Sequence, residues 1–342
     1  MGARPQFIKL APVVKAFKDL NLPYKVLHTG QHYDYTLSEL QFTALGMEEP
    51  HFNLEIGSDS HARQTARMLT GMEEVLVAEK PSLVLVYGDT NSTLAGALCA
   101  AKLGLKVGHV EAGVRSYDRK MPEEINRIVA DRLSTYHYCP TEGAMNILKS
   151  EGIPGILTGD VMYDALLQVP QEALQHPFQR PFVLVTIHRA ENTDSPERFG
   201  AIWDGLNLVS REVPVVFPVH PRTRHRHLAL LGQGTKDLSL IEPVSYLAMI
   251  AMIRDAACII TDSGGVQKEA FLLKSPCVTV RDTTEWPETV DAGANRLVDP
   301  AAKPILEATL TMMRKRAWEA DNPFGDGAAS YKIARHIREH CL

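Results

Sequence analysis

Short apolar runs alternate with longer amphipathic stretches along the chain. Two of the apolar runs, residues 83–87 and 107–110, enclose a stretch with helical spacing, and the alternation recurs around residues 182–188 and 258–265. Strands that are apolar throughout are typical of parallel sheets, because helices cover both faces of such sheets. The pattern therefore predicts an α/β fold in which buried strands and helices alternate.

A chain of 342 residues is too long for one ordinary core, so we expect two domains. Residues 168–180 are polar, contain Pro170 and Pro177, and show no clear periodicity, as is common in linkers. The strand and helix pattern restarts after this stretch. A last helix is expected over residues 328–340.

The amino end predicts an incomplete sheet. Residues 2–5 have the composition of a strand-to-helix turn, and helical spacing follows over residues 7–20. In a doubly wound domain, such a turn comes after a buried strand. We therefore expect either that the first strand lies upstream of this sequence or that the sheet lacks it.

Acidic residues follow the two apolar runs named first. Asp89 comes after residues 83–87, Glu111 comes after residues 107–110, and the pair Glu123-Glu124 stands where a further helix begins. Ligands of parallel sheets bind outside the carboxyl ends of the strands, so these acids are expected on one rim. Each acid alone has the ordinary interpretation of a helix cap or first-turn residue. Together they predict a site that moves protons.

The charge and cysteine pattern narrows the class of protein. A net charge of −5, from 36 basic and 41 acidic residues, argues against a nucleic-acid-binding protein. No apolar run approaches the roughly 20 residues that span a bilayer, and we expect a cytosolic protein without a membrane partner. The five cysteines are scattered without CxxC spacing, so neither a disulfide framework nor a metal site is expected.

The second half carries a candidate anion site. Asp262 and Ser263 precede Gly264 and Gly265 at a strand-to-helix junction, where free backbone N–H groups and the helix dipole favour a diphosphate. The alternative is an ordinary tight turn. Glu269, further along the same helix, is a candidate acceptor for ribose hydroxyls, or else a solvated helix residue.

Basic groups stand at further predicted junctions. Arg4 could bind a phosphate through its planar guanidinium group, and Lys9 could do so through its compact ammonium charge. His188 and His220 each end a strand of the second half, where a histidine either handles a proton or bonds a nearby carbonyl.

The motifs along the whole chain resemble those of the non-hydrolysing UDP-N-acetylglucosamine 2-epimerases. They are, in order, GARPQFIK, TGQHYD, VYGDTNSTLAGAL, GHVEAGVRS, MPEEINR, TIHRAENTD, VHPRTR, TDSGGVQKEA, RDTTEWPE and NPFGDGAAS. The resemblance implies two Rossmann-like domains in a glycosyltransferase-B arrangement with the active site in the interdomain cleft. It places one domain at residues 1–167, joined by a final helix at 328–342, and a UDP-binding domain at 168–327. A homodimer without nicotinamide or metal cofactor is implied.

The implied reaction interconverts UDP-GlcNAc and UDP-ManNAc by elimination of UDP to 2-acetamidoglucal and re-addition. Residues at the family's catalytic positions are Asp89, Glu111, Glu123 and His188; those at its substrate and diphosphate positions are Arg4 and Lys9; those at its nucleotide positions are His220, Ser263, Gly264 and Glu269.

Three positions depart from the main branch of the family: Trp286 replaces an arginine, Lys268 replaces a glutamate, and Met249 replaces a residue that is commonly aromatic. The combination of QKEAF, PCVTVRD and TEW also resembles the branch that acts on UDP-2,3-diacetamido-2,3-dideoxyglucuronate, which is the alternative substrate. A possible activator site is matched in part, by Gln31, His32 and Arg67. A glycosyltransferase and a non-catalytic nucleotide-sugar binder are alternatives of other classes, and the three acids favour proton chemistry over both.

Overall fold

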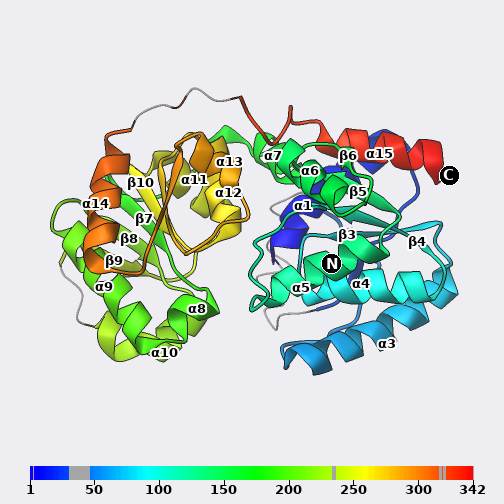
Figure 1. The fold of residues 1–342 in the computed structure, drawn as a ribbon, viewed down its shortest axis with the longest axis horizontal. Coiled ribbons are helices and arrows are strands. Elements are labelled where there is room, and N and C mark those ends of the chain that lie inside the picture. Colours follow the sequence, from blue (N-terminus) through cyan, green and yellow to red (C-terminus); the bar gives the residue numbers. More distant parts are fainter. Residues whose placement is uncertain (3, 31–46, 233–235, 316–317, 319–320, 342) are drawn as a thin grey trace. The chain divides into compact units, whose positions relative to one another are not determined.

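A computed structural model describes residues 1–2, 4–30, 47–232, 236–315, 318 and 321–341 (Figure 1). The chain divides into two compact units. Unit 1 comprises residues 1–168 and 322–342, and unit 2 comprises residues 169–321. Unit 2 is thus inserted in the sequence of unit 1, before its last helix.

Unit 1 contains two parallel sheets in its described part. The strands are β1 (Leu27–His28), β2 (Phe52–Asn53), β3 (Leu83–Tyr87), β4 (Lys106–Val110), β5 (Tyr136–Cys139) and β6 (Ile156–Leu157). One sheet consists of β1 and β2, and the other has the order β3-β4-β5-β6. The apolar runs at residues 83–87 and 107–110 form β3 and β4, as their pattern predicts.

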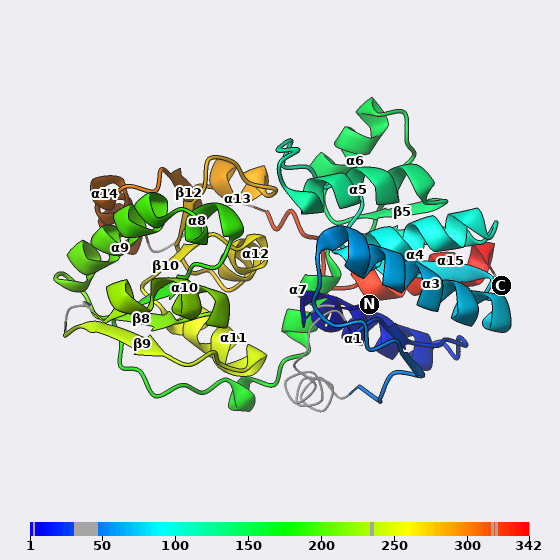
Figure 2. The same ribbon diagram turned by 90° about the horizontal axis from the view of Figure 1, so that it is seen from below.

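Helices cover both faces of the larger sheet of unit 1 (Figure 2). They are α1 (Arg4–Asp19), α3 (His61–Glu79), α4 (Asn91–Lys102), α5 (Pro122–Leu133), α6 (Glu142–Ser150), α7 (Val161–Leu167) and α15 (Ala329–His340). Side chains alternate along β3, so that Tyr87 packs with α1 and α15 while Val86 packs with α3 and α4. The two cores lie on opposite faces of the same strands.

Unit 2 contains one six-stranded parallel sheet of order β12-β11-β10-β7-β8-β9. Its strands are β7 (Val183–Thr186), β8 (Val215–Pro218), β9 (Leu238–Ile241), β10 (Cys258–Thr261), β11 (Cys277–Val280) and β12 (Asn295–Val298). This is the doubly wound order, in which the order of successive strands along the sheet reverses between the parallel neighbours β7 and β10. Ligands of such sheets bind outside the carboxyl ends of the strands at this reversal.

The helices of unit 2 follow its strands. They are the 3-10 turn η1 (Gln171–Ala173), α8 (Ala190–Thr193), α9 (Pro196–Ser210), α10 (Pro221–Leu231), α11 (Tyr246–Asp255), α12 (Gly264–Leu272), α13 (Pro287–Asp291) and α14 (Ala302–Met313). The main core is formed by α9 and α14 against residues of all six strands. The two helices whose amino ends lie at the reversal, α8 and α12, begin close to His188 and Ser263.

We predict that the last helix is essential to the stability of unit 1. Ile333 of α15 is fully buried in the core with α1 and β3, so Ile333→Ala is expected to lower the free energy of unfolding by roughly 2–5 kcal/mol. Arg335→Ala changes an exposed residue of the same helix and is expected to have little effect. Urea unfolding of both variants measures the difference, and equal losses would contradict the assignment.

Candidate functional site

The ends of β3 and β4 bring the first two predicted acids to one rim of the sheet. Tyr87 and Val110 are paired neighbours, so the residues that follow them leave the sheet side by side. Gly88 has φ 63° and Glu111 has φ 73°. Glycine adopts this left-handed conformation without strain, but a glutamate does not, and such strain is concentrated at functional positions. Glu111 is therefore a stronger candidate than its sequence position alone suggests.

Glu111 is paired with Lys9 of α1. The Lys9 Nζ lies 2.7 Å from the Glu111 Oε1, and only 6% and 8% of the two residues is exposed. A Cβ atom at Gly88 would lie 3.1 Å from the Lys9 Nζ, so any larger residue at this position would crowd the ion pair. The predicted anion-binding lysine and the predicted catalytic acid are thus in direct contact.

Asp89 is held by α5. Its carboxylate forms an ion pair with Arg127, and its backbone carbonyl accepts a hydrogen bond of 2.9 Å from Asn126 Nδ2. The Asp89 side chain is 24% exposed, so it is anchored but still reachable by a ligand. Arg127 also binds Glu124, with 3.3 Å between Nη1 and Oε2.

The adjacent acids Glu123 and Glu124 have different environments. Glu124 is buried and accepts hydrogen bonds from Ser116 N, Ser116 Oγ and Tyr117 N at 2.8, 2.9 and 3.0 Å, which fixes the loop before α5. Glu123 is half-buried, and within the described part of the chain its carboxylate has no hydrogen bond or ion pair. Of the two, Glu123 is the one available to a substrate.

A buried network behind this rim contains residues that the sequence pattern did not single out as functional. Asp131 of α5 binds His109 Nδ1 at 2.6 Å and Arg115 Nη1 at 2.6 Å, and the other His109 nitrogen lies 2.8 Å from the Gly88 carbonyl. Burial alone would raise the pKa of the Asp131 carboxyl, but His109 and Arg115 outweigh it and lower the pKa. The network therefore fixes the turn that precedes Asp89.

In unit 2, Asp262 at the end of β10 organises the reversal point. Its buried carboxylate accepts hydrogen bonds from His188 N at 3.1 Å, from Arg189 N at 3.0 Å and from Asn192 Nδ2 at 3.0 Å. The strand ends of β7 and β10 are thereby tied together. Asp262 is part of a predicted motif, but its structural role depends on contacts about 70 residues away in the sequence.

The two predicted histidines lie together at this reversal. The ring centroids of His188 and His220 are 5.8 Å apart, and the His188 side chain is 40% exposed. The His188 Nδ1 lies 3.7 Å from the Asp262 Oδ1, which is beyond hydrogen-bond distance. An exposed imidazole beside a buried carboxylate is suited to share a proton with an anionic ligand.

The amino end of α12 has the features of an anion site. Ser263 caps the helix, and its Oγ accepts a hydrogen bond from Val266 N. Within the described residues, the N–H groups of Gly264 and Gly265 have no protein acceptor, and the space beside Gly265 is open. These groups and the helix dipole favour a phosphate.

A charged cluster lies against this helix end. Glu285 binds Arg281 through two hydrogen bonds of 2.6 and 3.2 Å and lies 3.4 Å from Arg189 Nη2. The Glu191 Oε1 lies 3.5 Å from the Arg281 Nε, so the cluster pairs two arginines with two carboxylates. Lys268 and Trp286, which both depart from the family pattern, also meet here. The Lys268 Nζ lies 4.1 Å from the centroid of the Trp286 ring, in a cation–π contact.

The remaining predicted residues have varied settings. Glu269 is buried on α12. The Arg4 backbone begins α1, while its side chain lies outside the described part. Arg67 binds Asp59 on the surface at 3.0 Å, and Gln31 and His32 lie outside the described residues.

In the part that the structure describes, no group of three or more potential metal ligands occurs, and no helix is long and apolar enough to cross a membrane.

Comparison with known proteins gives matches along nearly the whole chain. The model of the family described as UDP-N-acetylglucosamine 2-epimerase matches residues 15–338. The chain is 46% identical to UDP-2,3-diacetamido-2,3-dideoxy-D-glucuronate 2-epimerase of Pseudomonas aeruginosa, with 98% of both chains covered. It is 47% identical to a UDP-N-acetylglucosamine 2-epimerase homolog of Methanococcus maripaludis, with 99% of this chain and 98% of the relative covered.

A solved structure is similar over the same length. The crystal structure of Methanocaldococcus jannaschii UDP-GlcNAc 2-epimerase in complex with UDP-GlcNAc and UDP has a TM-score of 0.93 and 42% identity, and covers 99% of this chain and 98% of that chain. The resemblance seen in the motifs and the predicted α/β fold class are both confirmed.

We predict that the buried network around Asp131 stabilises unit 1 in a pH-dependent way. A carboxyl whose pKa is lower in the folded state stabilises the fold above its unfolded pKa of about 4, and this stabilisation is lost as the pH falls through the folded value. Asp131→Asn is therefore expected to cost roughly 3–5 kcal/mol at pH 7 and progressively less below about pH 4. Urea unfolding across this pH range measures the difference.

The matched control for that variant is Asp204→Asn, the same change at an exposed residue of α9. It is expected to leave stability almost unchanged at every pH. A loss for Asp131→Asn that did not depend on pH would contradict the ion-pair explanation.

Proposed function

Because the chain belongs to the UDP-N-acetylglucosamine 2-epimerase family, a family of isomerases, we propose that it interconverts UDP-GlcNAc and UDP-ManNAc. The observation that carries the proposal is the set of acids at the ends of β3 and β4 and the start of α5. Epimerisation at a carbon centre needs one group that accepts a proton and another that donates one. Carboxylates in different environments can divide these roles, and the environments of these acids differ.

The proposed reaction has two balanced halves. In the first, the bond between C1 and the diphosphate oxygen breaks, the C2–H bond breaks, and its electron pair forms the C1=C2 double bond of 2-acetamidoglucal. The proton goes to a carboxylate and UDP leaves as an anion. In the second half, a proton returns to the opposite face of C2, and the diphosphate oxygen re-forms its bond to C1.

The proposed proton-handling groups are Asp89, Glu111 and Glu123. The pairing of Glu111 with Lys9 supports a coupling between substrate binding and the basicity of the Glu111 carboxylate. When a diphosphate competes for the Lys9 ammonium, the Glu111 carboxylate loses its counter-charge and becomes a stronger base. Asp89 keeps Arg127 as its partner, and Glu123 has no partner among the described residues, so the three carboxylates have different electrostatic surroundings.

Besides Arg4 and Lys9, the proposed UDP-holding groups belong to unit 2. The N–H groups of Gly264 and Gly265 bind phosphate oxygens, and His188 and His220 supply protons or positive charge as the diphosphate leaves. Glu269 accepts the ribose hydroxyls. Retention of UDP between the two halves of the reaction prevents loss of the reactive intermediate.

The alternative substrate is UDP-2,3-diacetamido-2,3-dideoxyglucuronate, the sugar named for the relative from Pseudomonas aeruginosa. A uronate adds a carboxylate that needs a cation once it leaves water. Lys268 and Arg281 are buried and already interact with Trp286 and Glu285, which favours the uncharged sugar.

Four further elements are part of the proposal and depend on the family resemblance. They are Arg4 as a phosphate ligand, a homodimer, a cytosolic location, and an activator site to which Gln31, His32 and Arg67 belong. Light scattering of the purified protein tests the dimer directly.

We predict that Asp89→Asn and Glu111→Gln each abolish loss of the C2 proton, because an amide cannot accept it at neutral pH. UDP affinity is expected to change no more than a few-fold, since the UDP-holding groups are unchanged. The measurement is exchange of C2–H for deuterium in deuterated water, followed by NMR, with UDP binding by calorimetry as evidence of folding. Glu212→Gln, an exposed acid of unit 2, is the control. Normal exchange in either site variant would contradict the assignment.

We also predict that UDP-GlcNAc is converted without any acceptor and about tenfold faster than the diacetamido-uronate, for the charge reason given above. NMR of both sugars incubated side by side measures the ratio. Asp89→Asn is expected to convert neither sugar and serves as the blank. Faster conversion of the uronate would make the alternative substrate the correct one, and a requirement for an acceptor would indicate a transferase.

A further inference from the structure

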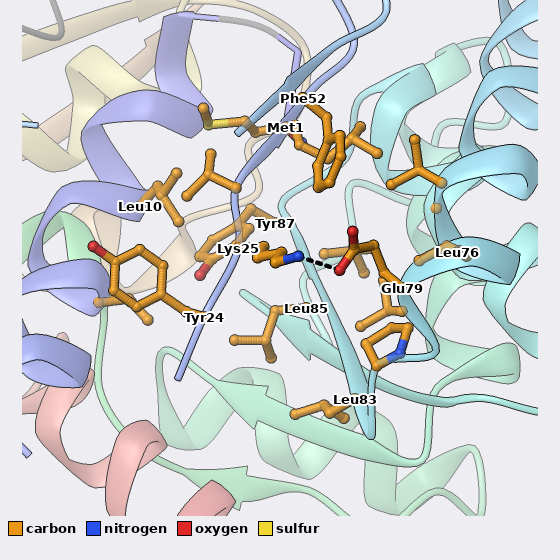
Figure 3. Close-up of a pocket in the computed structure, with 18 of the residues that line it drawn as sticks. Met1, Leu10, Tyr24, Lys25, Phe52, Leu76, Glu79, Leu83, Leu85 and Tyr87 are labelled. Carbon is orange, nitrogen blue, oxygen red and sulfur yellow. Dashed lines mark hydrogen bonds and ion pairs between the residues drawn. The ribbon is translucent and has the colours of Figure 1, made fainter. Parts of the chain in front are cut away.

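The cavity of unit 1 that Figure 3 shows does not contain the acids of the candidate site. Its volume is about 460 Å³, and apolar side chains such as Leu10 and Leu85 line much of it. Asp89, Glu111 and Glu123, all of which the structure describes, are not among its lining residues. A sugar on which these acids act is therefore expected to be contacted by groups at the rim itself.

One aromatic side chain near this rim is exposed. Tyr117 belongs to the loop between β4 and α5, which begins at Glu111 and leads to Glu123. It is 73% exposed. In the described part of the chain, its hydroxyl has no hydrogen bond and its ring contacts no other ring. The ring therefore contributes little to the packing of unit 1.

The backbone of Tyr117 has a left-handed conformation, with φ 60°. Residues other than glycine adopt this conformation at a cost in free energy. Asn21, Lys80 and Lys274 also have it, but they follow helices within two residues, where it is common. Tyr117 and Glu111 instead lie on the loop that carries the candidate site, and strain of this kind is concentrated at functional positions.

The buried carboxylate of Glu124 holds this conformation. Its Oε1 accepts a hydrogen bond from Tyr117 N at 3.0 Å, and its Oε2 accepts bonds from Ser116 N at 2.8 Å and Ser116 Oγ at 2.9 Å. Arg127 binds the same carboxylate and also that of Asp89. The backbone that carries the exposed ring is thus fixed by the side chains that anchor one of the proposed acids.

The charges at the rim indicate which part of a nucleotide sugar would meet the Tyr117 ring. The carboxylates of Asp89 and Glu123 repel a diphosphate, but they do not repel a neutral sugar. An acetamido sugar offers C–H groups and a methyl group to the face of an aromatic ring, and hydroxyl groups to a phenol oxygen. The chemistry of the rim therefore favours the neutral sugar.

We propose that Tyr117 is a specificity-determining residue, whose ring packs against the acetamido sugar of the bound nucleotide sugar and does not contact the diphosphate. This inference rests on the proposed function. Because Glu124 sets the conformation of the loop through the backbone, the ring can be removed without loss of the fold.

The test compares Tyr117→Gly with Tyr117→Phe by calorimetry of UDP-GlcNAc and UDP binding. For Tyr117→Gly, the Kd of UDP-GlcNAc is expected to rise about tenfold and that of UDP to change less than about twofold, because only the sugar loses a contact. Its Tm is expected to stay within about 2 °C of the parent or to rise, because glycine adopts this φ without strain. Tyr117→Phe keeps the ring and is expected to bind both ligands like the parent.

The matched control is Lys80→Gly, which makes the same change to a left-handed residue at the end of α3. It is expected to change neither Kd. Equal changes of the two Kd values in Tyr117→Gly, or no change in either, would overturn the proposal. So would dissociation of that variant into smaller species in light scattering, since the ring would then belong to an interface between copies of the chain.

The same measurements separate this inference from the proposed reaction. A parent chain that binds UDP-GlcNAc without converting it would refute the reaction, while the two Kd values of Tyr117→Gly would still decide the role of the ring. A parent chain that binds neither UDP-GlcNAc nor UDP would refute both.

Discussion

The geometry of the candidate site depends on buried carboxylates that tie strand ends together. In unit 1, Asp131 holds His109 and Arg115, and through His109 it fixes the Gly88 carbonyl. In unit 2, Asp262 holds the backbone that follows β7. Each carboxylate has several donors, which compensate for its loss of water. The exposed groups that would contact a ligand are therefore positioned by residues that it does not reach.

This arrangement explains which parts of the site the sequence could predict. The continuous apolar runs predicted β3, β4, β7 and β10, and the residues immediately after them are the candidate groups, because a parallel sheet places its ligands there. The capping role of Ser263 and the first turn of α12 are also local properties of the sequence. Here periodicity and local chemistry were sufficient.

The remaining features depend on contacts between distant residues. Asp131 meets His109 across 22 positions and Asp262 meets His188 across 74, and no local pattern predicts either pairing. The different environments of Glu123 and Glu124 follow from the path of the loop at residues 116–117, which their identical side chains do not reveal. Lys268 and Trp286 appeared as separate departures from a family pattern, and only the fold shows that they form one cation–π pair.

The return of the chain to unit 1 has a consequence for its synthesis. The last helix, α15, supplies Ala329, Ile333, Ala334 and Ile337 to a core whose other buried members precede residue 168. At about 5–20 residues per second, the synthesis of unit 2 alone takes on the order of ten to thirty seconds, and this helix is made only afterwards. During that interval unit 2 is free to fold as a continuous segment, while α1 keeps an uncovered apolar face on the ribosome. Unit 1 is therefore the part of the nascent chain that would most need a chaperone.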